Sequence, residues 1–300
     1  MNMKVDLCGV TLNNPVMTAS GTFGSGAEYA EFVDLNKLGA VVTKGVANVP
    51  WPGNPTPRVA EVYGGMLNAV GLQNPGIDLF VERDIPFLKQ FDTKIMVNVC
   101  GHSTEEYIEV VERLRDQPVD LLEINISCPN VKEGGIAFGQ DPKAVEAITK
   151  EMKKHAAQPV IMKLSPNVTD ITEMARAAEA GGADGLSLIN TITGMKIDIN
   201  RQKFVLANKT GGMSGPAIHP VAVRMVYQVA QAVSLPIIGM GGIATAEDAL
   251  EFIMAGATAV SVGTANFFNP YATVEIAEGI EKFMEAQHVE DIHELIGAVK

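Results

Sequence analysis

Short apolar runs rich in β-branched residues alternate along the chain with longer amphipathic stretches. Continuous apolar runs of this length are typical of strands in a parallel sheet that is covered on both faces. The runs are PVMTAS (15–20), AVVTKG (40–45), KIMVNV (94–99), LLEINIS (121–127), PVIMKLS (159–165), GLSLIN (185–190), PIIGMGG (236–242) and AVSVGT (259–264). Helical spacing covers residues 103–116, 141–156, 170–182, 219–233 and 245–256, and several of these segments begin with a Ser, Thr or Asp cap.

This order of elements predicts an α/β fold, a TIM (β/α)8 barrel, with an open doubly wound sheet as the alternative. No linker or break in composition divides the chain, so we expect one domain over residues 1–300. Three insertions, at 46–76, 128–141 and 191–219, are too long for simple loops between a strand and a helix. Each follows the carboxyl end of a predicted strand, which is the face where barrel enzymes hold their sites.

Charge and cysteine content narrow the classes of function. The 35 acidic and 23 basic residues give a net charge of −12, which argues against a nucleic-acid partner because such a partner requires a basic face. The three cysteines, Cys8, Cys100 and Cys128, form no CxxC pair, which favours a reducing cytoplasm. The N-terminus lacks the apolar core of a signal peptide. The charge-free run at 252–274 is broken by glycines and a proline, so we expect a cytoplasmic protein without a membrane segment.

Polar residues and glycines stand at the ends of the predicted strands. They are Ser20, Gly21, Lys44, Asn98, Asn125, Lys163, Asn190, Gly241, Gly242, Gly263 and Thr264. Taken singly, each of these residues is more often a solvated or capping residue. The cysteines Cys8 and Cys100 are not among them, and their ordinary interpretation is inert packing in the core. In a barrel, however, all of these strand ends share one rim, and charges beside buried runs need partners. Together they predict a polar site on an apolar barrel.

The glycine turns after the seventh and eighth strands are where such barrels commonly bind phosphate, because backbone N–H groups can approach an anion there. A phosphate cradle at 242–264, a central lysine and a row of amides together fit flavin mononucleotide (FMN), one per chain. FAD or NAD within this chain is disfavoured because no strand–GxGxxG–helix fingerprint occurs, and no metal site is expected. Three alternatives stay open: an aldolase or lyase with a Schiff base at Lys44 or Lys163, a dehydrogenase using Cys128 as a covalent nucleophile, and a non-catalytic barrel.

Several longer motifs resemble the dihydroorotate dehydrogenase family from about residue 3 to residue 285. They are KGVANVPWPGNPTPR, NAVGLQNPG, VNVCG, NISCPNVKEGG, MKLSPN, INTITGMKIDI, GGMSGPAIHPVAVRMV and GMGGI. The sequences of two segments are more similar to the NAD-linked heteromeric form (class 1B) than to the soluble, homodimeric, fumarate-dependent form (class 1A). These segments are CPNVKEGGIAFGQD and NKTGGMSGPAIHPVAVRMV. Both of these forms carry the cysteine, whereas the membrane-associated branch uses serine.

The resemblance implies an FMN-dependent TIM barrel that oxidises dihydroorotate to orotate in pyrimidine biosynthesis. Cys128 matches the base that removes the C5 proton while hydride passes from C6 to flavin N5, and the 130–140 loop would close over the site. Flavin contacts would come from Ser20, Lys44, Gly45, Asn98, Asn125, Lys163, Ile189, Gly215, Gly241, Gly242, Gly263 and Thr264. Substrate contacts would come from Lys44, Asn68, Ala69, Val70, Gly71, Leu72, Asn125, Asn190 and Thr191.

Electron transfer to NAD through an iron–sulfur cluster normally takes four cysteine thiolates. Three scattered cysteines cannot supply them, so this chain is incomplete for NAD reduction. The resemblance implies a second polypeptide that carries FAD and a 2Fe–2S cluster, in a heterotetramer of two plus two subunits with a dimer of the catalytic subunit at its centre.

Overall fold

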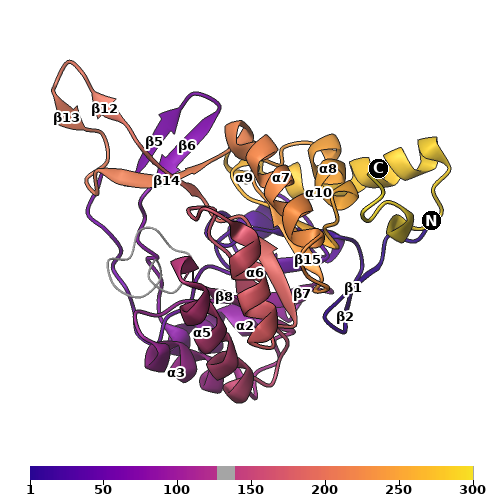
Figure 1. The fold of residues 1–300 in the computed structure, drawn as a ribbon, viewed down its shortest axis with the longest axis horizontal. Helices are drawn as coiled ribbons and strands as arrows, with labels where there is room; N and C mark the ends of the chain where they lie inside the picture. Colours follow the sequence, from indigo (N-terminus) through magenta and orange to yellow (C-terminus); the bar gives the residue numbers. More distant parts are fainter. Residues whose placement is uncertain (127–138, 300) are drawn as a thin grey trace.

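A closed barrel of eight parallel strands forms the centre of the computed structural model, which describes residues 1–126 and 139–299 (Figure 1). The strands follow one another around the barrel in the order β3 (Val16–Thr18), β4 (Ala40–Val42), β7 (Lys94–Val99), β8 (Leu121–Asn125), β9 (Val160–Lys163), β10 (Gly185–Leu188), β15 (Ile237–Met240) and β16 (Ala259–Val262). Each of the eight predicted runs contains one of these strands. The predicted TIM barrel is therefore confirmed, and the open doubly wound sheet is wrong because β16 pairs with β3 and closes the ring.

Burial explains why these runs are continuously apolar. Every residue of seven of the strands is buried, and in β7 only the first residue, Lys94, is partly exposed. One face of each strand points into the barrel and the other packs under the helices, so neither face tolerates the alternating polar positions of a one-sided sheet.

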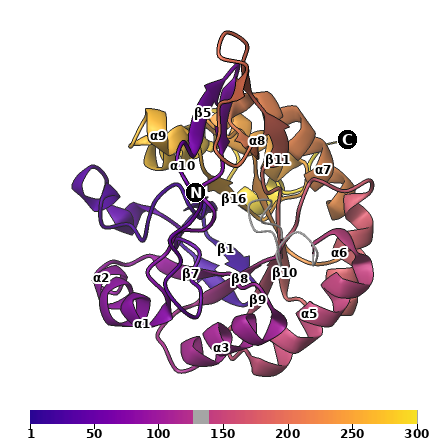
Figure 2. The same cartoon turned by 90° about the vertical axis from the view of Figure 1, so that its left-hand side faces the viewer.

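Helices surround the barrel, as Figure 2 shows. They are α1 (Ile77–Leu79), α2 (Ile85–Leu88), α3 (Thr104–Leu114), α5 (Pro142–His155), α6 (Ile171–Ala180), α7 (His219–Ala230), α8 (Ala246–Met254), α9 (Ala265–Phe268) and α10 (Ala272–Gln287). The side chains of Ser103, Asp141, Asp170 and Thr245 accept hydrogen bonds from the first turns of α3, α5, α6 and α8. The predicted caps are thus confirmed, because each satisfies an N–H group that has no partner within its helix.

The insertions at 46–76 and 191–219 contain strands that were not predicted. A four-stranded antiparallel sheet has the order β11 (Ile192–Met195), β14 (Thr210–Ser214), β6 (Gly65–Asn68) and β5 (Val59–Val62). A hairpin of β12 (Ile197–Asp198) and β13 (Lys203–Phe204) extends from it, on the opposite side of the molecule from both termini (Figure 1). The pairing of β14 with β6 joins the two insertions, which leave the barrel after β4 and β10.

The amino-terminal end of the barrel is covered by the hairpin of β1 (Val5–Leu7) and β2 (Val10–Leu12). Leu7 and Leu12 are fully buried, and Cys8 in the turn donates a hydrogen bond from Sγ to the carbonyl oxygen of Asp184, 3.3 Å away. Burial, followed by the negative charges of Asp184 and Asp6, raises the pKa of the Cys8 thiol to about 12. None of the helices in the described ranges is long and apolar enough to cross a membrane.

Cys8 and Cys100 are expected to resist alkylation in the native protein. With a pKa of about 12, Cys8 has a thiolate fraction of about 10⁻⁴ at pH 8, and Cys100 is fully buried. Iodoacetamide treatment at pH 8 followed by peptide mass spectrometry should leave both unmodified while glutathione in the same tube reacts. The same protein in guanidinium is the control, and there both should be alkylated. Native modification of Cys8 at the rate of glutathione would contradict this assignment.

Candidate active site at the carboxyl end of the barrel

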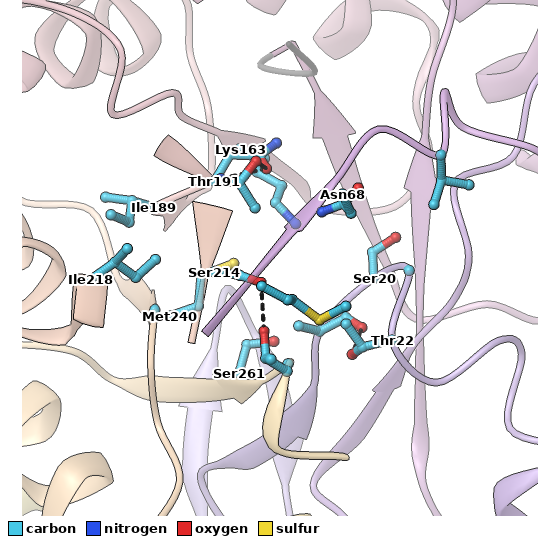
Figure 3. Close-up of a pocket in the computed structure, with 18 of the residues that line it drawn as sticks. Ser20, Thr22, Asn68, Lys163, Ile189, Thr191, Ser214, Ile218, Met240 and Ser261 are labelled. Atoms are coloured by element: carbon cyan, nitrogen blue, oxygen red, sulfur yellow. Dashed lines mark hydrogen bonds between the residues drawn. The ribbon is translucent and has the colours of Figure 1, made fainter. Parts of the chain in front are cut away.

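A cavity opens at the carboxyl ends of the barrel strands, and the small antiparallel sheet forms part of its wall (Figure 3). Ile189, Ile218 and Met240 make an apolar wall, whereas Ser20 and Thr22 stand on the opposite side. Lys163, the last residue of β9, lies in the wall together with Lys44 and Asn68. The cavity thus combines an apolar wall with cationic and amide groups, which suits a heterocycle that has apolar faces and carries negative charge.

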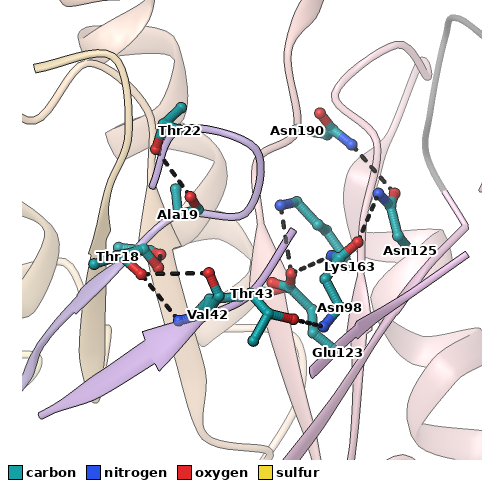
Figure 4. Close-up of polar contacts among 12 residues, drawn as sticks. Thr18, Ala19, Thr22, Val42, Thr43, Asn98, Glu123, Asn125, Lys163 and Asn190 are labelled. Atoms are coloured by element: carbon teal, nitrogen blue, oxygen red, sulfur yellow. Dashed lines mark hydrogen bonds and ion pairs between the residues drawn. The ribbon is translucent and has the colours of Figure 1, made fainter. Parts of the chain in front are cut away.

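A line of hydrogen-bonded side chains runs down from the cavity into the barrel (Figure 4). Asn190 Nδ2 donates to Asn125 Oδ1 over 3.4 Å, and Asn125 Nδ2 donates to Asn98 Oδ1 over 3.4 Å. Asn98 Nδ2 then donates to Glu123 Oε2 over 2.6 Å. Because each amide both donates and accepts, the orientation of every side chain in the line depends on the next.

A buried ion pair joins the cavity wall to the interior of the barrel. Lys163 Nζ is 3.5 Å from Glu123 Oε2, and both side chains are almost fully buried. Ser187 donates to the other carboxylate oxygen, Glu123 Oε1, over 2.7 Å. The lysine predicted to need a partner at its strand end therefore has one, on the neighbouring strand.

The two glycine turns form a cradle that suits an anion. The backbone N–H groups of Gly242, Gly263 and Thr264 have no hydrogen-bond acceptor among the described residues. Gly242 has φ +73°, and a Cβ there would lie 2.7 Å from the carbonyl oxygen of Gly215 and 2.9 Å from His219 Cβ. The hydroxyl groups of Thr264 and Ser214 are hydrogen-bonded at 2.7 Å. Unpaired N–H groups at close-packed glycines are the donor set that binds a phosphate.

The family model described as dihydroorotate dehydrogenase matches residues 2–284. The chain belongs to the dihydroorotate dehydrogenase family. A relative from Lachnoclostridium phytofermentans is 75% identical over 300 residues, covering 100% of both chains. One from Alkaliphilus metalliredigens is 66% identical over 299 residues, covering 100% of this chain and 99% of its own. One from Geobacter sulfurreducens is 56% identical over 300 residues, covering 100% and 98%. All three are named dihydroorotate dehydrogenase B (NAD(+)), catalytic subunit.

Most positions that the resemblance to dihydroorotate dehydrogenases assigns to a ligand line this one cavity. They are Ser20, Lys44, Asn68, Val70, Gly71, Leu72, Asn125, Lys163, Ile189, Asn190, Thr191, Gly241, Gly242, Gly263 and Thr264. They come from seven barrel strand ends and both insertions, so only the folded chain brings them together. The individual roles assigned to them stay predictions.

Four assigned positions lie behind the wall of the cavity. Asn98 is inside β7 rather than after it, fully buried below the rim. A Cβ on Gly45 would lie 3.0 Å from Asn98 Oδ1, so Gly45 packs over that amide. Ala69 belongs to the buried core of the small sheet, and Gly215 packs against Gly65 and Gly242. These residues support the cavity wall from behind. Cys128 and residues 130–138 of the expected closing loop lie outside the described residues.

Sequence reasoning missed Glu123 and Ser187, the two partners of the buried network that belong to neither assigned set. The signal was present in LLEINIS, where an acidic residue interrupts an otherwise apolar strand. A buried carboxylate requires hydrogen-bond donors or a counter-charge. An acidic residue in a predicted barrel strand therefore indicates a polar partner inside the barrel. Groups of three or more His, Cys, Asp or Glu side chains suited to a metal ion do not occur in the described part of the chain.

Proposed function

We propose that this chain is the FMN-containing catalytic subunit of an NAD-linked dihydroorotate dehydrogenase, which oxidises dihydroorotate to orotate in the synthesis of UMP. The observation that carries the proposal is the single cavity in which Lys163, Asn125 and the Gly241–Gly242 turn meet. The relatives match this chain over its whole length, and we take the reaction and the electron acceptor from their names. We expect the protein to act in the cytoplasm as one catalytic domain.

The described residues fit FMN. Gly242, Gly263 and Thr264 would hold the phosphate through backbone N–H groups without a described acceptor. Ile189 and Met240 would cover the apolar face of the ring system, and Lys163 would stand beside its polar edge. When bound, FMN supplies a hydride acceptor in this cavity.

The remaining polar residues are assigned to the substrate. Lys44 would bind the carboxylate of dihydroorotate, and Asn68, Asn125 and Asn190 would hydrogen-bond the carbonyl and N–H edges of the pyrimidine ring. Cys128 would take the proton from C5, as a base positioned against a carbon acid. Oriented donors and a closed, dry site would hold the reacting carbon in place while this proton leaves.

The electrons must then leave the chain. Its three cysteines are one fewer than a cluster normally needs, so we assign the 2Fe–2S cluster and the FAD to a partner subunit, in a complex of two plus two chains. The curated names, which call the relatives catalytic subunits, support the existence of such a partner.

One assay separates this proposal from the fumarate-dependent alternative. The chain should be purified alone and with its partner, and dihydroorotate oxidation should be followed with NAD and with fumarate. We expect NAD reduction only with the partner present and no fumarate turnover by the chain alone. Fumarate turnover by the isolated chain would assign it to the homodimeric form. A colourless protein trapped by borohydride with substrate would indicate the aldolase alternative.

A further inference from the structure

Glu123 places a carboxylate inside the barrel, where apolar side chains normally fill the space. It is the third residue of β8 and is only 1% exposed. Glu123 pairs in register with Asn98 of β7, and Lys163 of β9 pairs with Ser187 of β10. The interior of this part of the barrel is therefore a polar cluster supplied by four neighbouring strands.

The contacts of Glu123 divide into two kinds. The neutral side chains of Asn98 and Ser187 donate hydrogen bonds of 2.6 and 2.7 Å, one to each carboxylate oxygen. Lys163 adds a charge at 3.5 Å, a longer contact. The hydrogen bonds from the two neutral donors fix the carboxylate in place, and the fixed carboxylate then attracts the ammonium group.

Lys163 connects this cluster to the ligand site. It lines the cavity, whereas Glu123 does not. No other described carboxylate lies within ion-pair distance of Lys163, and no further described acceptor takes a hydrogen bond from its Nζ. An ammonium has three N–H donors, and the described residues accept a hydrogen bond from one of them.

We propose that Glu123 is a positioning residue, which holds the Lys163 ammonium group at the cavity wall. The inference rests on the proposed function, since it concerns how the same site binds FMN. Glu123 faces Lys163 from β8, and β7 and β10 add only the neutral Asn98 and Ser187. Lys44 lines the same cavity as a second cation. A buried lysine without a counter-charge favours its neutral form, because desolvation penalises the ammonium.

The first test is FMN binding by the purified chain, measured by quenching of flavin fluorescence at pH 6 and pH 9. Glu123→Gln keeps the size of the side chain and removes its charge. Relative to wild type at the same pH, we expect affinity to fall about tenfold at pH 9 and less than about threefold at pH 6, where acid restores the ammonium. Ratios at each pH remove the effect of the phosphate's own ionisation near pH 6. Glu123→Asp, which keeps the charge, should recover most of the affinity at pH 9.

A double-variant cycle separates positioning from simple packing. Lys163→Met should weaken FMN binding at both pH values. Adding Glu123→Gln to Lys163→Met should leave the affinity unchanged or improve it, because a carboxylate that has lost its counter-charge is removed. Ser187→Ala, which deletes one hydrogen bond to the carboxylate but no charge, should stay within about threefold of wild type at both pH values.

The inference is overturned if Glu123→Gln weakens binding equally at both pH values, or by the same factor with and without Lys163. If Glu123→Gln alone does not fold, as judged by circular dichroism, the comparison of Lys163→Met with the double variant becomes the test. The double variant removes both charges of the pair together, so it leaves no unpaired buried charge. A tenfold weaker double variant would overturn the inference. Wild-type protein that binds no FMN would instead refute the proposed function, and this inference with it.

Discussion

Replacing Cys128 by alanine is expected to slow flavin reduction by dihydroorotate about 10²–10⁴-fold at neutral pH, the usual effect of removing a positioned base. Binding of FMN should not change, because the cradle residues Gly242 and Thr264 are untouched. The measurement is anaerobic stopped-flow bleaching of the flavin after mixing with dihydroorotate.

The pH dependence follows from the chemistry of a thiol. An unperturbed cysteine has a pKa of about 8.5, and only the thiolate accepts the proton. In the wild type, the rate should therefore rise with pH, by about tenfold per unit below the thiol pKa, and level off above it. In Cys128→Ala this rise should disappear. Cys8→Ala is the matched control, since Cys8 lies at the opposite end of the barrel, and it should reduce its flavin at the wild-type rate. A wild-type rate in Cys128→Ala would refute the assignment of the base.

Replacing Gly242 by alanine is expected to weaken FMN binding by about 100-fold or more, so that the protein purifies nearly colourless. Gly242 has φ +73°, and the new Cβ would lie 2.7 Å from the carbonyl oxygen of Gly215. The turn must therefore move, and its N–H groups would leave the positions that suit a phosphate. The measurements are the ratio of flavin to protein absorbance and a titration with FMN.

Gly9→Ala is a matched control for this substitution. Gly9 also has a positive φ, +84°, but a Cβ there would have nothing within 4 Å, and it lies in the hairpin at the other end of the barrel. In this variant the only expected effect comes from placing a Cβ at a positive φ, which should lower the free energy of unfolding by about 1 kcal/mol. The protein should retain FMN. Full flavin content in Gly242→Ala, or equal loss in both variants, would contradict the phosphate cradle.

The barrel strands were predictable because their signal is local. A run such as KIMVNV needs only its own composition to indicate a strand buried on both faces, and β7 spans the same six residues. The small sheet was not predictable in this way. Its strands β6 and β14 carry glycines and partly buried residues, and they pair across about 145 positions of sequence. Only the register between two distant insertions makes them strands.

By itself, the sequence determined the repeating order of strands and helices, the glycine turns after the last two barrel strands, and a cysteine count too small for an iron–sulfur cluster. These properties depend on residue type and short-range spacing. The tertiary structure alone decided that Asn98 lies beneath the cavity, and that Glu123 pairs with Lys163. The physical reason is that barrel closure and strand register determine which side chains share the interior, and both arise from contacts between residues far apart in the chain.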